Sequence, residues 1–330
     1  MVLDRLYRRY TVRLYLLSPL WQEIAQSWNS SRRAVNMNPI NIAGSYIGDG
    51  NFVPIVAEIG INHSGSVETA KKLIRAAHDV GCSAAKFQKR TIEVVYTAEE
   101  LTKPRESPFG MTNGELKRAL EFGMDEYDEI VAYCDELDFT FFFSAWDEAS
   151  VDFAAQLGAP CFKIASACLT DDNLLRHHLQ YKKPIILSTA MSTLRQIDHA
   201  IEILGTDNLV IMHCVALYPC PGEHLNLRVI QTLKERYKTP VGWSGHELGL
   251  ATTVAAVAMG ANIVERHITL DRSSFGSDQS ASVEPQGMQR LVRDIREVER
   301  ARGDGIKRML PEEQSIAKKL RRVDTLKLED

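Results

Sequence analysis

The chain of 330 residues is 45% hydrophobic and 25% charged, an ordinary globular composition that excludes a disordered or fibrous protein. Its formal net charge of −4 and the lack of a Lys/Arg run interleaved with aromatic residues argue against a nucleic-acid surface and favour a small-molecule partner. No apolar run is long enough to span a membrane. Six cysteines without paired CxxC spacing argue against a disulfide framework or a zinc knot, so we expect a reducing, cytoplasmic compartment.

The first 36 residues differ from the rest of the chain. Their arginines outnumber their acids, and leucines and tyrosines recur at loosely helical spacing. The segment could be a targeting sequence, an amphipathic surface helix or a dispensable extension upstream of Met37. The last interpretation is favoured, because the regular pattern begins only after NPINI. The stretch INIAGSYIGDGNF that follows predicts a β-hairpin at the bottom of the next domain.

From residue 53 onward one unit repeats, made of a short β-branched or aromatic run, a polar residue and an amphipathic helical stretch. Glycines stand where helix C-caps are expected. Eight such units over about 250 residues predict a closed (β/α)8 TIM barrel of parallel strands over residues 37–304, with a charge-rich tail over 305–330. The longest connection, residues 89–123, is expected to be a functional or mobile loop. The eight runs are 53–60, 83–88, 140–146, 161–166, 184–189, 209–214, 241–246 and 262–267.

Polar side chains end these runs, at the edge where such barrels carry their chemistry. Because side chains alternate along a strand, Lys86 and Gln88 share one face, and Glu265 and His267 share the face opposite Arg266. The strand ends therefore predict a ring of reactive groups at one end of the barrel. The ring comprises Glu58, Lys86, Gln88, Ser144, Lys163, Ser166, Ser188, His213, His246, Glu265 and His267.

Two histidines of the ring are candidate metal ligands. A single histidine at a strand end is more often a hydrogen-bonded structural residue. His213 and His246 come from adjacent strands, about 4.8 Å apart, so their imidazoles could converge on one ion. A site with imidazole nitrogen and carboxylate oxygen as ligands, and with positions open to water, suits manganese, zinc or iron. On this interpretation Cys214 points the opposite way from His213 and packs outside the barrel.

The two lysines of the ring, Lys86 and Lys163, need anions, because an unpaired ammonium inside a barrel carries a heavy desolvation cost. Their partner could be a buried carboxylate such as Glu58 or Glu265. A phosphate is favoured, because the three serines of the ring offer hydroxyl donors on the same side. A Schiff-base lysine is a third possibility. Glu58 could be a general base, a partner for a histidine, or an ion-pair partner of Lys86.

Longer motifs follow one another in a fixed order, namely AEIGINHSG, AAKFQ, FKIAS, PIILSTAMST, IMHCVALYPCP, GWSGHELG, IVERHITLD and GSDQSASVEP. This series resembles the N-acetylneuraminate (sialic acid) synthase family. The resemblance implies a (β/α)8 enzyme that condenses phosphoenolpyruvate with an open-chain N-acetylated hexosamine similar to N-acetylmannosamine. The implied products are a sialic-acid-like 2-keto-3-deoxy nonulosonate and phosphate. A divalent metal ion, most often Mn²⁺, a homodimer and a role in surface polysaccharide biosynthesis are implied as well.

The same resemblance implies roles for individual residues. Lys86 and Lys163 would hold the phosphate and carboxylate of phosphoenolpyruvate, and Glu58 would position or activate the water that attacks its C2. These three would be the catalytic residues. His213 and His246 would hold the metal. The implied substrate-binding residues are Gln88, Ser144, Ser166, Ser188, Tyr218, Glu265, His267 and Asp278.

The chain departs from the family pattern at several positions. Cys168 replaces the usual acid that contacts sugar, which leaves the acceptor open. Val215 and Cys220 replace the usual hydroxyl residues after the sixth strand. The family's C-terminal antifreeze-like domain has no counterpart in the sequence, which resembles a short form of the family.

Three other functions compete with the nonulosonate synthase. One is a related synthase of 3-deoxy-ulosonate phosphates that takes a phosphorylated aldose, for which Arg90 and Arg105 are the obvious extra basic residues. The second is a Schiff-base aldolase without a metal. The third is a non-catalytic, sugar-binding barrel. The GINHSG turn favours the nonulosonate branch, and the presence of both lysines and both histidines argues against a mere scaffold.

Overall fold

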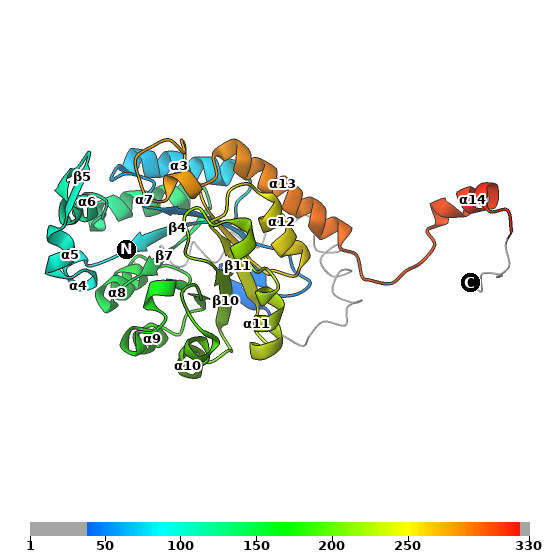
Figure 1. Ribbon diagram of the computed structural model, residues 1–330, viewed down its shortest axis with the longest axis horizontal. Helices are drawn as coiled ribbons and strands as arrows, with labels where there is room; N and C mark the ends of the chain where they lie inside the picture. The colour runs from blue at the N-terminus through cyan, green and yellow to red at the C-terminus, as the bar shows by residue number, and fades with distance from the viewer. Residues whose placement is uncertain (1–37, 324–330) are drawn as a thin grey trace.

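The computed structural model describes residues 38–323. Eight parallel strands close into a barrel in the order β10-β11-β12-β3-β4-β7-β8-β9, and helices surround it (Figure 1). The predicted (β/α)8 TIM barrel is confirmed, with each strand at its predicted place. The barrel strands are β3 (Ile55–Gly60), β4 (Ala84–Lys89), β7 (Thr140–Ala145), β8 (Phe162–Ile164), β9 (Ile185–Ser188), β10 (Leu209–Cys214), β11 (Val241–Gly245) and β12 (Val264–His267).

The helices begin and end with local signals that the sequence carries. Ser66 and Thr193 accept hydrogen bonds from the main chain at the start of their helices. The predicted C-cap glycines have left-handed φ angles, such as 87° at Gly81 and 100° at Gly260. The helices that follow the barrel strands are α3 (Val67–Asp79), α7 (Met124–Glu136), α8 (Glu148–Gln156), α9 (Asp172–Leu179), α10 (Leu194–Leu204), α11 (Val229–Tyr237), α12 (Ala251–Ala258) and α13 (Pro285–Ala301).

The predicted N-terminal hairpin is present as β1 (Ile40–Ile42) and β2 (Ser45–Ile47). Asp49, just after it, accepts hydrogen bonds from Lys234 Nζ at 2.6 Å and from Asn262 Nδ2 at 2.8 Å. Because Asn262 precedes β12, the hairpin covers the N-terminal end of the barrel, opposite the predicted ring. The predicted extension over residues 1–36 lies outside the described residues.

The connection between β4 and β7, which the sequence predicted to be a functional or mobile loop, contains regular helices and strands. It contains two short helices, an antiparallel hairpin and a third helix, which project from one side of the barrel (Figure 1). Thr112 and Glu115 form a capping box at the start of the third helix. The elements are α4 (Ile92–Val95), α5 (Ala98–Thr102), β5 (Pro104–Ser107), β6 (Gly110–Thr112) and α6 (Asn113–Ala119).

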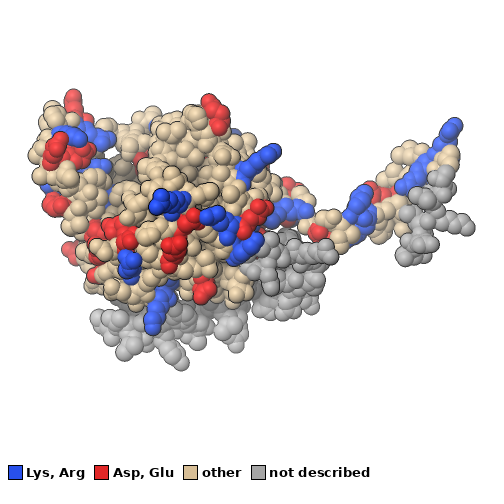
Figure 2. Space-filling view, turned by 60° about the horizontal axis from the view of Figure 1, so that its bottom comes forward, with Lys and Arg blue, Asp and Glu red and all other residues tan. Residues whose placement is uncertain are grey.

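The predicted tail contains α14 (Pro311–Leu320), which lies apart from the barrel (Figure 1). On the face of the molecule shown in Figure 2, basic and acidic side chains are interspersed rather than gathered by sign. No helix within residues 38–323 is long and apolar enough to cross a membrane. All six cysteines are buried and free, in agreement with the prediction from their spacing.

The two faces of the barrel wall differ in character. Phe87 and Phe143 point outward and pack against the Tyr127 ring of α7, with ring centroids 5.7 and 4.9 Å away. The inside of the barrel is tightly packed. Position 242 of β11 requires glycine, because neighbouring side chains leave no room for a Cβ atom. A Cβ at this position would lie 2.4 Å from Ile263 Cγ2 and 2.5 Å from Met212 Sδ.

We therefore expect Gly242→Ala to lower the free energy of unfolding by about 1–3 kcal/mol, because the added methyl group overpacks the barrel interior. Urea unfolding followed by circular dichroism measures this. Gly222→Ala is the matched control, because a Cβ there meets nothing within 4 Å. Equal stability of both variants would contradict the packing described here.

Candidate active site

Four charged side chains from four strands meet inside the barrel. Lys86 Nζ lies 2.8 Å from Glu58 Oε2 and 3.7 Å from Glu265 Oε1. Lys163 Nζ donates to both carboxylate oxygens of Glu265 at 3.1 Å. All four side chains are buried. Two lysines face two glutamates, so this charge cluster is balanced by the protein alone.

The cluster shifts the pKa values of three of its members. For Lys163, burial outweighs the attraction of Glu265 and lowers the pKa. Burial alone would lower the pKa of Lys86, but Glu265 and Glu58 outweigh that effect, so the pKa lies above its usual value. Burial alone would raise the pKa of Glu265, but Lys163 and Lys86 hold it at about 2. The buried-carboxylate partners considered for the lysines are therefore present in the structure.

Neutral donors and acceptors extend the cluster. Lys86 Nζ donates to Ser144 Oγ at 2.8 Å. Gln88 Nε2 donates to Glu58 Oε1 at 2.8 Å. Ser244 Oγ, which was not among the predicted site residues, donates to Glu265 Oε1 at 3.1 Å. Its signal was its position two residues before His246, on the same face of the strand.

The other two serines of the predicted ring lie on neighbouring strand ends. Ser166 Oγ accepts a hydrogen bond from the main-chain N–H of Ala190 at 3.0 Å. Ser188 is buried at the end of β9. Neither hydroxyl has a hydrogen bond to the cluster among residues 38–323, in contrast to that of Ser144.

A second group of residues consists of His246, His267 and Tyr218. The two imidazole centroids are 5.4 Å apart, and the Tyr218 ring lies 4.0 Å from His246 and 5.8 Å from His267. His246 Nδ1 lies 2.7 Å from the carbonyl oxygen of Val215 and donates to it, which leaves Nε2 with a free lone pair. Burial and then His267 lower the pKa of His246 to about 3, so the ring is neutral.

His267 has an unsatisfied atom. Its Nδ1 is buried and has no hydrogen-bond partner among the residues that the structure describes. Asp278 Oδ2 lies 3.6 Å away. His267 and Asp278 were predicted to bind substrate. In the structure His267 lies beside His246, and Asp278 lies beside His267.

His213 lies elsewhere, so the predicted pairing of His213 with His246 is wrong. His213 Nε2 donates to the carbonyl oxygen of Leu225 at 2.8 Å, and its ring lies 5.2 Å from that of Trp243. His213 and Trp243 are partners in the register of β10 and β11. Side chains at paired positions share a face, and this is the face toward the helices.

Cys214 takes the inward place that had been assigned to His213. It pairs with Ser244 in the register, and its Sγ lies 3.4 Å from Ser166 Oγ. Since Ser244 contacts Glu265 inside the barrel, Cys214 faces the interior too. The prediction that Cys214 packs outside is wrong for the same reason as the His213 pairing, namely a one-residue error in the phase of β10.

A family model described as the NeuB family matches residues 73–307. The chain belongs to the NeuB family. It is 40% identical to N-acetylneuraminate-9-phosphate synthase of Mus musculus, over 84% of this chain and 79% of the relative. It is 35% identical to N,N′-diacetyllegionaminic acid synthase of Campylobacter jejuni, over 79% of this chain and 80% of the relative.

Solved structures agree with this assignment. The N-acetylneuraminic acid (sialic acid) synthetase of Leptospira borgpetersenii, in complex with citrate, superposes with a TM-score of 0.77 at 28% identity. The similarity covers 87% of this chain and 99% of that one. The predicted resemblance is thereby confirmed.

The histidine pair of this NeuB-family barrel fits a divalent metal ion. Nε2 of His246 has a free lone pair, and Nδ1 of His267 has no hydrogen-bond partner in residues 38–323. Each ring therefore has a nitrogen that could bind a metal ion. Among residues 38–323, no group of three or more His, Cys, Asp or Glu side chains is arranged to hold an ion. A metal here would therefore take its other ligands from water or substrate, which is typical of catalytic sites.

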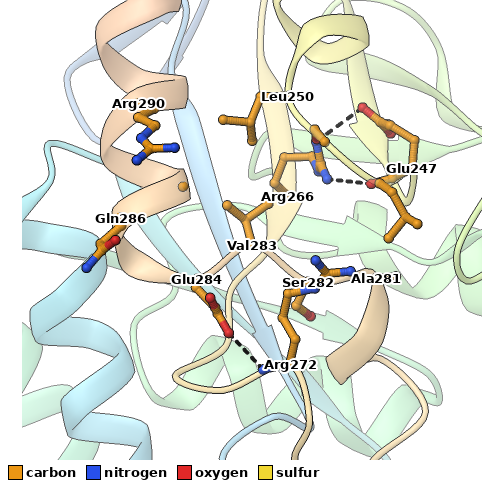
Figure 3. Close-up of a pocket in the computed structure, with 13 residues that line it drawn as sticks. Glu247, Leu250, Arg266, Arg272, Ala281, Ser282, Val283, Glu284, Gln286 and Arg290 are labelled. Carbon is orange, nitrogen blue, oxygen red and sulfur yellow. Dashed lines mark hydrogen bonds and ion pairs between the residues drawn. The ribbon is translucent and has the colours of Figure 1, made fainter.

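Arg266 supports this pair from the outer face of the barrel, as the alternation along β12 predicted. Its guanidinium donates to Glu247 Oε1 at 3.1 Å and to the main-chain oxygen of Glu247 at 2.7 Å (Figure 3). These bonds fix the segment directly after His246. A pocket of about 250 Å³ beside Arg266 lies on this outer side, away from the charge cluster.

The GINHSG turn after β3 closes one side of the site. Asn62 Nδ2 donates to the carbonyl oxygen of Ile268 at 2.9 Å and to Ser282 Oγ at 2.8 Å, which ties the turn to the segment after β12. The buried His63 stacks on Phe122 with centroids 4.1 Å apart. Burial lowers the pKa of His63 to about 3.

His63 makes the stability of the protein depend on pH. In the unfolded chain the pKa of His63 has the ordinary value of 6.5. Between pH 6.5 and 3 the unfolded state therefore binds a proton at this residue, whereas the folded state does not. The free energy of unfolding is unaffected by protonation of this residue above pH 6.5. Below that pH it falls by about 1.4 kcal/mol per pH unit as the pH decreases toward 3. We expect His63→Gln to flatten this part of the stability curve in urea titrations from pH 7 to about pH 4.5. The exposed His224→Gln is the control, and equal slopes for both variants would contradict the assignment.

Proposed function

We propose that this protein condenses phosphoenolpyruvate with an open-chain N-acetylated hexosamine similar to N-acetylmannosamine, giving a sialic-acid-like 2-keto-3-deoxy nonulosonate and phosphate. The observation that carries the proposal is the buried cluster of Lys86, Glu58, Glu265 and Lys163 beside the pair of His246 and His267. The names of two relatives, N-acetylneuraminate-9-phosphate synthase of mouse and N,N′-diacetyllegionaminic acid synthase of Campylobacter, support a synthase of sialic-acid-like acids, and the mouse name specifies a phosphorylated product. The homodimer and the surface-polysaccharide role stay predictions.

The charge balance of the cluster determines how phosphoenolpyruvate would bind. Lys86 and Lys163 are rigid donors for its phosphate and carboxylate, and Ser144 lies beside them. Because two glutamates already neutralise the two lysines, a multiply charged anion needs further positive charge in the same region. A divalent ion on the histidine pair would supply it, and for that reason we include a metal, Mn²⁺ by family resemblance, in the proposal.

The reaction joins C3 of phosphoenolpyruvate to the aldehyde carbon of the sugar. Water adds to the electron-poor C2, and the C2–O bond to phosphate then breaks to leave the ketone. Glu58, held by Lys86 and Gln88, positions this water and, as a general base, accepts a proton from it as the oxygen attacks C2. A metal on His246 and His267 would act as a Lewis acid on the aldehyde oxygen.

The direct test is phosphate release from phosphoenolpyruvate with Mn²⁺ and a panel of aldoses. We expect release that depends on both metal and sugar, and we expect Lys86→Met to lower kcat/KM at least about 100-fold, because a preorganised charge near the phosphate is lost. Lys72→Met, on the exposed face of α3, should match the parent protein. No sugar-dependent release with any acceptor would overturn the proposal.

The metal ligands are tested separately by Mn²⁺ binding, followed by electron paramagnetic resonance without substrate. We expect His246→Ala and His267→Ala each to weaken binding at least about tenfold, and His213→Gln to leave it unchanged, because His213 faces the helices. Loss of binding in His213→Gln but not in His267→Ala would restore the original pairing. Circular dichroism of each variant verifies that it is folded.

A further inference from the structure

We infer that Cys214 is a positioning residue for phosphoenolpyruvate, because its thiol directs the hydroxyl proton of Ser166 toward an anionic oxygen of that substrate. The inference rests on the proposed function and concerns the half of the site that would bind phosphoenolpyruvate. Its basis is a thiol that faces the barrel interior and contacts a serine hydroxyl, which a main-chain N–H already holds from another direction.

Cys214 ends β10 and projects into the barrel. It is the register partner of Ser244, whose hydroxyl donates to Glu265 inside the barrel. Lys163 and Tyr218 both lie within electrostatic reach of the Cys214 sulfur. Only 5% of the residue is exposed. The thiol is therefore part of the interior of the candidate active site, close to the charge cluster.

The Ser166 hydroxyl has one proton to donate and two lone pairs that can accept. One lone pair accepts the main-chain N–H of Ala190 at 3.0 Å. Cys214 Sγ lies 3.4 Å from Ser166 Oγ, and either atom can be the donor in this contact. Because a thiol is both a weak donor and a weak acceptor, the contact alone does not fix the direction of the hydroxyl proton.

An anionic oxygen beside Ser166 would fix that direction. A carboxylate or phosphate oxygen is a much stronger acceptor than a thiol sulfur, so the hydroxyl would donate to the anion. The thiol of Cys214 would then donate to the second lone pair of Ser166 Oγ. With both lone pairs filled by protein donors, the hydroxyl proton has only the anion as its partner, and the hydrogen bonds in such a chain strengthen one another.

Ser144 shows the same arrangement with a charged donor. Its Oγ accepts from Lys86 Nζ at 2.8 Å, so its hydroxyl proton is also available to a ligand. Ser144 is the register partner of Lys163, and Ser166 follows Lys163 by three residues along the chain. Two hydroxyls directed by protein donors, beside two ammonium groups, form a cradle suited to the anionic groups of phosphoenolpyruvate.

The test measures the Kd of radiolabelled phosphoenolpyruvate by equilibrium dialysis, with Mn²⁺ and without a sugar. We expect Cys214→Ala to raise this Kd about three- to tenfold, the effect of one lost hydrogen bond. In a Ser166→Ala background, Cys214→Ala should raise the Kd no further, because the hydroxyl that the thiol directs is already absent.

Two further variants separate hydrogen bonding from packing. Cys214→Ser removes nearly the same volume as Cys214→Ala but keeps a donor, so it should bind phosphoenolpyruvate more tightly than Cys214→Ala. Cys82→Ala is the matched control, because it removes another buried thiol, between α3 and β4 at the opposite end of the barrel, and should leave the Kd unchanged. Circular dichroism verifies that each variant is folded.

The inference would be overturned by an unchanged Kd in Cys214→Ala, by the same fold increase in both backgrounds, or by equal Kd values for Cys214→Ala and Cys214→Ser. In each case sugar-dependent phosphate release by the parent protein would leave the proposed function intact. The expected Kd pattern without release for any sugar would support the inference and overturn the proposed function. If the parent protein does not bind phosphoenolpyruvate, both fail.

Discussion

The structure depends on a buried, balanced set of four charges, made by Lys86 and Lys163 with Glu58 and Glu265. Burying each of these groups costs several kcal/mol, and attraction between them offsets that cost only when the geometry is good. Apolar side chains of similar volume would stabilise a barrel at least as well. The cluster is therefore better understood as a preorganised site. The stability of the rest of the fold offsets the free-energy cost of burying its charges.

Side chains on the outer face of the barrel anchor the strands that carry the cluster. Phe87 and Phe143 alternate with the site residues of β4 and β7 and pack against α7, so each charged side chain projects from a strand that is anchored on its other side. Arg266 does the same for β12, where it flanks Glu265 and His267. Groups held on rigid strands keep their mutual geometry, which positions substrates without large rearrangement. The metal ion proposed for the histidine pair would add positive charge beside this balanced cluster.

Much of this architecture follows from the sequence. The eight strands and their polar ends were predicted, because each run is bounded by glycine or a cap and separated by an amphipathic helix. The phase of β10 was not predictable. In LVIMHC all six residues are buried, so the sequence pattern does not distinguish the inner from the outer face of the strand. The register pairs Cys214 with the inward Ser244, which places the neighbouring His213 on the outer face. The elements of the 89–123 connection were missed because each is too short for a periodic signal. The contact of Arg90 with Trp146 joins two strands and has no local signature.

The central claim is that this barrel forms a carbon–carbon bond from phosphoenolpyruvate and that water attacks C2. Phosphoenolpyruvate labelled with ¹⁸O at the oxygen that bridges C2 and phosphorus tests it most directly, in the presence of Mn²⁺ and the best acceptor. The account predicts that the label leaves with the released phosphate, because the C2–O bond breaks after water has added to C2. Label retained in the organic product would show that water attacked phosphorus instead, and would contradict the account.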